Sequence, residues 1–415
     1  MKKLIMLLTA YSLSLTPSVA QSKWTQRISL PSTPRGYGIG FSIGNYGYVG
    51  LGGRINSGWE YFTDFWQFDP SSNSWTRKAD FPGKARICPA TFVIGKYAYV
   101  VSGSQNNHGN DMVSECWQYN SVTNIWTRKH DFPGISRYSA VGFAIGSKGF
   151  IGTGYDTLYD NVMKDFWEYD TTSDAWTKKN DFGGIARYSA SGFAVGGKGY
   201  ICFGVDSDGN TYSTAKDIWE YSIITDSWMQ KSNNPIDSLA GTNGFVIGSD
   251  IYVGVGETYF PVIGFADFWK YTPTSDAWIK QANFIGGKRA VCSAFSIGDT
   301  GYLGLGVYDS IFNGTNTMYR FLPDSITGIN EIFNGQELSL FPNPANQKLN
   351  ITFKRQDLGL VTLSIMDITG REILLIAKNE NSGSMQIDVS SLTTGMYFIN
   401  IKNKDLNVTQ KFIKY

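Results

Sequence analysis

The sequence predicts an all-β protein in which a ring of six sheets is followed by a small β-sandwich. The first observation is a repeat of 50 to 52 residues, marked by tryptophans at 66, 117, 167, 219 and 269 and by a second series at 24, 75, 126, 176, 228 and 278. The second is that short apolar runs alternate with clusters of Gly, Asn, Asp and Ser, which is typical of strands joined by turns. The third is a change of pattern after Pro323, where the repeat stops.

Each repeat contains four expected strands. In the third copy we expect them at residues 137–145, 149–154 and 165–170 and around Trp176-Thr-Lys-Lys. Adjacent residues of the third strand, such as Phe166 and Trp167, are both apolar, which predicts a sheet that is covered on both faces. A ring of sheets stacked face to face covers both faces and leaves few exposed edges.

The ring is expected to be closed by the N-terminal segment. First strands begin near Arg35, Arg86, Arg137, Arg187, Leu239 and Arg289, which makes six units. The sixth unit runs to Met318-Tyr-Arg-Phe321 and then lacks a fourth strand, whereas Lys23-Trp-Thr-Gln-Arg27 matches the fourth strand of the other units. We therefore expect residues 23–28 to complete the sixth sheet.

The repeats resemble kelch repeats. The shared features are an Arg at the start of the first strand, a second strand ending in Gly-Gly, an aromatic third strand ending in Asp or Asn, and a Trp in the fourth. Tyr48-Val-Gly-Leu-Gly-Gly53 keeps the double Gly, whereas Thr153-Gly154 and its counterparts keep one Gly. The resemblance covers roughly residues 23–322 and implies a six-bladed kelch β-propeller within residues 21–323.

The C-terminal residues 338–415 alternate apolar and polar positions in about seven short runs, which predicts a small immunoglobulin-like β-sandwich. Residues 324–337 are polar and are expected to form a linker. The C-terminal part resembles the type A sorting domain of the type IX secretion system in Phe341-Pro-Asn-Pro-Ala345, Asp367-Ile-Thr-Gly-Arg371, Leu392-Thr-Thr-Gly-Met-Tyr-Phe398 and Lys411-Phe-Ile-Lys414. The resemblance implies that residues 338–415 engage that secretion machinery; the alternative is an accessory immunoglobulin-like module.

The N-terminal residues 1–20 predict a secretory signal peptide. They combine Lys2-Lys3, an apolar run over 4–15 and Ser18-Val19-Ala20 before Gln21. Together with the sorting domain, this implies export to the outer-membrane surface or the medium of a Gram-negative bacterium. No later apolar run reaches the roughly 18 residues of a transmembrane helix. The net charge of +1 gives no argument for a nucleic-acid partner.

The candidate binding site lies on the long loops between second and third strands, at 54–63, 104–114, 155–164, 205–216, 257–266 and 307–317. These loops and those leading into the first strands should emerge on one face, around the central channel. Trp59 is the one tryptophan outside the two repeat positions. Aromatic faces suit sugar rings or an extended peptide, so we predict ligand contacts at Trp59, Tyr61, Tyr155 and Tyr259. The alternative is that the loops pack over their own aromatic side chains.

The arginines that open the first strands are a second candidate set. Arg35, Arg86, Arg137, Arg187 and Arg289 recur in register, and a ring of guanidinium groups at a channel mouth can hold a carboxylate bidentately. The alternative is a structural role, in which each Arg pairs with the Asp six residues earlier (Asp80, Asp131 and Asp181 in the clearest copies).

The sequence favours an exported, monomeric binding module for a glycan or a protein over an enzyme. It offers no catalytic, metal-binding or cofactor-binding set: the four cysteines form no CxxC pair, and their disulfide state stays open. The alternative function is that of a sugar mutarotase or epimerase of the six-bladed kelch type. A carboxylate at the channel would serve that chemistry, for which Glu60, Asp156, Glu257 and Asp309 are placed.

Overall fold

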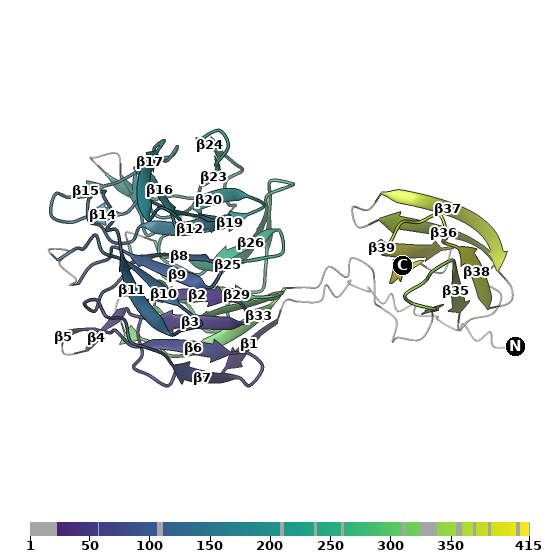
Figure 1. Cartoon of the computed structure of the whole chain (residues 1–415), viewed down its shortest axis with the longest axis horizontal. Coiled ribbons are helices and arrows are strands. Elements are labelled where there is room, and N and C mark those ends of the chain that lie inside the picture. The colour runs from purple at the N-terminus through teal and green to yellow at the C-terminus, as the bar shows by residue number, and fades with distance from the viewer. Residues whose placement is uncertain are drawn as a thin grey trace, which may run out of the picture. The chain divides into compact units, whose positions relative to one another are not determined.

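We describe the protein from a computed structural model. It describes residues 23–414 except 57, 106–110, 208–210, 236–238, 259–260, 309–312, 324–337, 354–358, 368–370, 381–382 and 404–406. These residues form strands and turns without a helix, which confirms the predicted all-β class (Figure 1); none of them belongs to a helix with the length and apolar character to cross a membrane. The predicted signal peptide (1–20) and linker (324–337) lie outside the described residues.

The chain divides into two compact units between Pro323 and Asp324. In the described part of the first unit there are six four-stranded antiparallel sheets, which we call blades one to six in the order of their first strands. The first strands are β2 (Ile39–Ile43), β8 (Ala90–Ile94), β12 (Val141–Ile145), β19 (Ser191–Val195), β25 (Asn243–Ile247) and β29 (Ser293–Ile297). The second strands are β3 (Tyr46–Gly50), β9 (Tyr97–Val101), β13 (Lys148–Gly152), β20 (Lys198–Cys202), β26 (Asp250–Gly254) and β30 (Thr300–Gly304).

The outer half of each blade carries the tryptophan series. The third strands are β6 (Phe65–Asp69), β10 (Cys116–Asn120), β16 (Phe166–Asp170), β23 (Ile218–Ser222), β27 (Phe268–Thr272) and β33 (Met318–Leu322). The fourth strands are β7 (Ser74–Arg77), β11 (Ile125–Lys129), β17 (Ala175–Lys179), β24 (Ser227–Gln230), β28 (Ala277–Lys280) and, from the other end of the chain, β1 (Lys23–Arg27). This arrangement is a β-propeller, as the sequence predicts.

Blade six joins the two ends of the repeat array. Strand β1 pairs antiparallel with β33, with Trp24 opposite Phe321 (Figure 1). The Trp24 ring is buried, and its centroid lies 5.0 Å from that of Phe268 in β27 and 4.8 Å from that of Phe321. Its Nε1 donates a hydrogen bond to the carbonyl of Ala282 (3.1 Å). Strand β1 therefore completes one blade and packs against the blade before it.

Neighbouring blades are joined by a closed circuit of backbone hydrogen bonds. The residue two positions after each Arg has a positive φ, as in Ser139 (54°) and Ser189 (53°). Its N–H donates to the carbonyl of the equivalent residue in the previous blade, at 2.8–3.0 Å, around the series Tyr37, Cys88, Ser139, Ser189, Gly241, Val291 and back to Tyr37. Because this turn uses residues 137–140, the first strand of blade three begins at Val141, four residues later than we expected.

A second circuit explains the glycine pattern. In each blade, a glycine N–H donates a hydrogen bond to the backbone carbonyl of the residue at the Arg position of the next blade, at 2.7–3.0 Å. These glycines are Gly52, Gly103, Gly154, Gly204, Gly256 and Gly306. The residue before each Gly also has a positive φ although it is not glycine, for example Leu51 (57°) and Thr153 (61°). The equivalent pair in blade one is therefore Leu51-Gly52, and the apparent double Gly at 52–53 is one residue out of register with the other copies.

The first strands pack closely around the channel, which requires small residues there. A Cβ atom on Gly142 would lie 2.5 Å from the carbonyl oxygen of Thr91 in the neighbouring blade. Farther out, a Cβ atom on Gly149 would lie 2.2 Å from the Phe92 ring. Six aromatic-rich clusters of buried side chains form the described core of the first unit, and one mainly aliphatic cluster forms that of the second.

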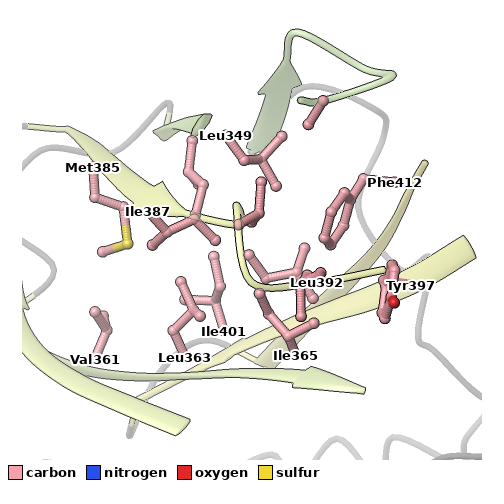
Figure 2. Packing of buried hydrophobic residues seen from close by; sticks show 14 residues of the cluster. Leu349, Val361, Leu363, Ile365, Met385, Ile387, Leu392, Tyr397, Ile401 and Phe412 are labelled. Atoms are coloured by element: carbon pink, nitrogen blue, oxygen red, sulfur yellow. The ribbon is translucent and has the colours of Figure 1, made fainter. Parts of the chain in front are cut away.

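The second unit is a sandwich of two sheets with seven described strands. One sheet has the order β34 (Leu338–Phe341), β35 (Lys348–Phe353), β38 (Ser384–Asp388), and the other has the order β37 (Glu372–Glu380), β36 (Gly359–Asp367), β39 (Gly395–Lys402), β40 (Asn407–Lys414). Figure 2 shows Leu349 and Ile387 of the first sheet facing Leu363 and Ile401 of the second across the core. The buried Phe412 of the last strand joins this core.

Replacing Trp24 with alanine tests the closure. We expect Trp24→Ala to lower the free energy of unfolding by about 3–5 kcal/mol, because it removes a large buried ring. Chemical denaturation of the full chain followed by intrinsic fluorescence measures the change, and Trp59→Ala, outside the blade cores, is the matched control. Equal stability of the Trp24 variant and the parent would show that closure does not depend on this strand.

Candidate binding site at the channel mouth

The long loops and the segments leading into the first strands lie on one face, as the sequence predicts. In each blade the two segments pair with each other: the bridges are Gly36 to Gly53, Ile87 to Ser104, Tyr138 to Tyr155, Ala240 to Glu257 and Ala290 to Val307, and Arg187 pairs with Asp206 in blade four. Short strands extend these loops, namely β4 (Gly53–Asn56) with β5 (Gly58–Tyr61), β14 (Tyr155–Asp156) with β15 (Asn161–Val162), β18 (Arg187–Tyr188) with β21 (Val205–Ser207) and β22 (Tyr212–Thr214), and β31 (Val307–Tyr308) with β32 (Asn313–Gly314). We call this face the channel mouth.

Two contiguous cavities follow the ring axis. The cavity at the mouth has a volume of about 110 Å³ and is lined by the residues of the first hydrogen-bond circuit, including Tyr37, Ser139 and Ser189. It shares Gly38, Ala140 and other residues with a cavity of about 370 Å³ between the first strands. Glycine, alanine and backbone groups dominate the lining of the larger cavity, so side chains with distinctive chemistry lie at its mouth.

An aromatic cluster stands on blade one beside the mouth. The rings of Trp59 and Tyr61 stack with their centroids 5.8 Å apart and an interplanar angle of 9°. Trp59 also lies 5.8 Å from Tyr37, which lines the mouth cavity. The hairpin β4–β5 carries both Trp59 and Tyr61, so the loop does pack on its own aromatic side chain, while Trp59 is only half-buried.

A second aromatic cluster stands on blades three and four. Tyr155 stacks on Tyr188 with their centroids 5.0 Å apart, and Tyr138 lies 5.8 Å from Tyr155. The hydroxyl groups of Tyr155 and Tyr212 both donate to Asp160, at 2.8 Å from Tyr212. These two bonds hold the pKa of Asp160 below its usual value. The carboxylate thus fixes the loops of blades three and four to each other.

Tyr37 is surrounded by groups from other blades. Burial, followed by the charges of Cys88, Glu257 and Tyr138, raises the pKa of the Tyr37 phenol well above its usual value. The phenol therefore keeps its proton at neutral pH. Tyr37, Tyr138 and Glu257 belong to blades one, three and five: Tyr37 lines the mouth cavity, Tyr138 precedes its lining residue Ser139, and Glu257 pairs with Ala240, which precedes its lining residue Gly241.

The structure brings part of the predicted site together. Trp59, Tyr61 and Tyr155 lie at the mouth in the two aromatic clusters, whereas Tyr259 lies outside the described residues. Their role in ligand binding stays a prediction. Sequence reasoning missed Tyr37, Tyr138 and Tyr188; the signal was present, because Tyr138 and Tyr188 each follow an Arg of the repeat directly and Tyr37 follows Arg35 by two residues.

The five repeat arginines are buried inside the blades, with no solvent exposure. Arg137 shows the arrangement: its Nη1 donates to the carbonyl of Thr153 (2.9 Å), and its two Nη groups bind the Asp165 carboxylate at 2.5 and 2.8 Å. The same carboxylate accepts a bond from Nε1 of Trp167 (2.8 Å). Burial alone raises the pKa of Asp165, but the bonds and charge of Arg137 outweigh it, so the pKa is lowered.

This geometry corrects the expected partner of each arginine. Arg35, Arg86, Arg137 and Arg187 pair with Asp64, Glu115, Asp165 and Asp217, which lie 28 to 30 residues later in the chain. The aspartates six residues before the arginines pair instead with neighbours in the fourth strands: Asp80 with Arg77, Asp131 with Arg128 and Asp181 with Lys178. The physical reason is that the third strand enters its blade beside the Arg turn, whereas the earlier Asp lies on the exposed side of the fourth strand.

Comparisons with known proteins bear on both units. Residues 339–415 match the family model of the secretion system C-terminal sorting domain. The second unit is therefore a sorting domain of the type IX system, and the protein is exported to the cell surface or the extracellular space.

Two curated proteins resemble part of the chain. An N-acetylneuraminate epimerase of Yersinia enterocolitica is 30% identical over 128 residues, which are 30% of this chain and 31% of that protein. An N-acetylneuraminate epimerase of Pasteurella multocida is 29% identical over 143 residues, 32% of this chain and 36% of that protein. The chain thus matches about a third of the length of these relatives. The solved structure of YjhT superposes with a TM-score of 0.58 at 16% identity, over 70% of this chain and 96% of that one, a likeness of fold.

Breaking one buried pair tests the structural role of the arginines. We expect Arg137→Ala to lower the free energy of unfolding by roughly 3–5 kcal/mol, because it leaves the Asp165 carboxylate partly buried without its partner. The matched control is Arg77→Ala, which breaks a pair whose side chains are 57% and 44% exposed and should cost at most about 1 kcal/mol. Denaturation curves of both variants measure the difference, and similar losses would contradict the assignment.

Proposed function

We propose that this exported propeller binds a saccharide at the channel mouth. The observation that carries the proposal is the pair of aromatic clusters at the mouth, Tyr37-Trp59-Tyr61 on blade one and Tyr138-Tyr155-Tyr188 on blades three and four. Flat aromatic faces stack on the apolar faces of sugar rings, while phenol hydroxyls and nearby polar groups orient the sugar hydroxyls. We also infer that the repeats are of the kelch type and that residues 1–20 are a signal peptide.

The export of the protein agrees with this function. A sorting domain places the propeller outside the cell, where glycans are abundant ligands. The two partial relatives are named for a reaction of a sugar, which supports a carbohydrate ligand over a protein ligand. The loops vary from blade to blade while the blades repeat, so a ligand of low symmetry can be recognised at the mouth.

Trp59→Ala tests the binding site. We expect it to weaken saccharide binding at least tenfold, because it removes the stacking surface that bridges Tyr37 and Tyr61. A glycan array identifies the ligand, and isothermal titration measures its affinity for the parent and the variant. Tyr159→Ala, at a residue of the same face that is 74% exposed, is the matched control and should bind normally. Unchanged binding by the Trp59 variant would refute this site.

A second candidate function is the exchange of sugar anomers. It is favoured by Glu257, whose backbone pairs with Ala240 beside the mouth cavity that Tyr37 also lines, and whose charge contributes to raising the pKa of the Tyr37 phenol. In ring opening, a carboxylate can take the proton of the anomeric hydroxyl while a protonated phenol donates a proton to the ring oxygen. The names of the two relatives point to the same class of reaction.

NMR measurement of anomer exchange separates the two functions. We expect that, if the protein catalyses exchange of a hexose or of N-acetylneuraminate, Glu257→Gln will slow it by about 10²–10⁴-fold, the usual contribution of a general base. Glu60→Gln, whose carboxylate pairs with Arg54 at 2.8 Å, is the control. Exchange at the uncatalysed rate with the parent would leave binding as the function, and full activity of the Glu257 variant would exclude this residue as the base.

A further inference from the structure

The long loops of the channel mouth are acidic in a chain that is nearly neutral, while the segments leading into the first strands add the exposed Lys84 and Lys288 to this face. The six long loops carry eight Asp and Glu against three Lys and Arg, a net charge of −5, whereas the whole chain has +1. The acidic residues are Glu60, Asp111, Asp156, Asp160, Asp206 and Glu257, together with Asp208 and Asp309 of the same loops, which lie outside the described residues. A concave face with this balance lowers the local concentration of anions and raises that of cations.

The three basic loop residues do not offset this charge at the mouth. The Arg54 guanidinium is bound to Glu60 within the hairpin β4–β5. Lys164 and Lys216 directly precede Asp165 and Asp217, and their carbonyls accept bonds from the N–H groups of Phe182 and Asn234. They therefore lie at the outer ends of their loops, beside the third strands, which are separated from the ring axis by the first and second strands.

The repeat arginines do not face the mouth either. Four of them bind carboxylates inside their blades. Arg289 differs, because the hydrogen-bond acceptors around it among the described residues are neutral: it donates to the Leu305 carbonyl (3.1 Å) and the Tyr308 hydroxyl (2.9 Å). Its guanidinium is covered by the rings of Phe284, Tyr308 and Tyr319 at 4.8–5.7 Å, and the residue has no exposed surface. A ligand at the mouth does not reach it.

The described residues that line the two cavities carry no charge. They offer hydroxyl groups on Ser139, Ser189 and Thr242, the amide of Asn243, and backbone groups. Each of these binds a sugar hydroxyl well, whereas a carboxylate there would lose its water without meeting a cation. It would also approach Glu257, whose backbone pairs with Ala240 directly before Gly241, a residue that lines the mouth cavity. The same features that suit a neutral sugar therefore disfavour an acidic one.

We propose that the mouth selects uncharged saccharides and excludes acidic sugars, both uronic and sialic acids. This inference rests on the proposed saccharide binding and narrows it to one chemical class. It separates this chain from its partial relatives, which are named for a sugar acid, N-acetylneuraminate. The ligand class is set by charge, because the stacking surfaces themselves accept neutral and acidic rings alike.

Matched sugar pairs test the proposal with the full chain. The pairs are methyl glucoside with methyl glucuronide, methyl galactoside with methyl galacturonide, and the methyl ester of N-acetylneuraminic acid with the free acid. Competition against the array ligand gives the relative affinities at about 20 mM and about 500 mM NaCl, where the Debye length falls from roughly 20 Å to roughly 4 Å. We expect the acidic member to bind at least tenfold more weakly at low salt and the gap to shrink at high salt.

Two variants locate the effect. Glu257→Gln should reduce the difference in affinity between the neutral and the acidic sugar of a pair. Asp299→Asn, in the turn between β29 and β30 at the other end of the channel, should leave that difference unchanged. An acidic sugar that binds as tightly as its neutral partner at low salt would overturn the selectivity and leave saccharide binding intact. A protein that binds no saccharide in the array would overturn the proposed function and this inference together.

Discussion

In four of the six blades, a buried arginine bound to a carboxylate ties three segments together. In blade three, Arg137 donates to the carbonyl of Thr153, a residue held at a φ of 61°, and to the Asp165 carboxylate that also accepts from Trp167. One side chain thus fixes the start of the first strand, the end of the second and the start of the third. The cost of burying the charge is offset because its carboxylate partner is in place and further hydrogen bonds satisfy both groups.

Blade five has Leu239 where the other blades have arginine, and its chemistry changes accordingly. The equivalent carboxylate, Asp267, pairs with Lys280 in the fourth strand at 2.7 Å. Nε1 of Trp269 is buried without a hydrogen-bond partner among the described residues, whereas its counterparts Trp66 and Trp219 bind their carboxylates. The backbone circuits still pass through this blade, from Gly204 to Leu239 and from Gly241 to Ser189. The backbone circuits therefore do not require the arginine, which reinforces the five blades that carry it.

Because the arginines serve the scaffold, they are not available to contact a ligand at the channel mouth. The repeat arginines, which the sequence predicts at the channel mouth, are enclosed in the blades. The loops contribute aromatic rings, hydroxyl groups and carboxylates to the mouth instead. Recognition there relies on stacking and on hydrogen bonds between neutral groups. The sorting domain is a separate unit with its own core, so the chemistry of the mouth and the route of export are specified by different parts of the chain.

The candidate site was only partly predictable for a definable reason. Trp59, Tyr61 and Tyr155 could be singled out because they fall outside the repeated positions. Tyr37, Tyr138 and Tyr188 lie within two residues of a repeat arginine and look like scaffold, yet the left-handed turn that forms the first circuit brings them to the mouth. The repeat identifies the residues that all blades share, whereas the candidate binding residues stand at positions that differ between blades.

The sequence by itself determined the strand repeat, the closure through Trp24 and the sorting domain, because each is written in residues whose spacing is local and regular. Only the tertiary structure decided which carboxylate each arginine binds and which residues meet Tyr37. Those partners lie 28 or more residues away or in other blades, and their approach is set by how the strands turn at the mouth. The spacing of residues along the chain therefore does not predict these contacts.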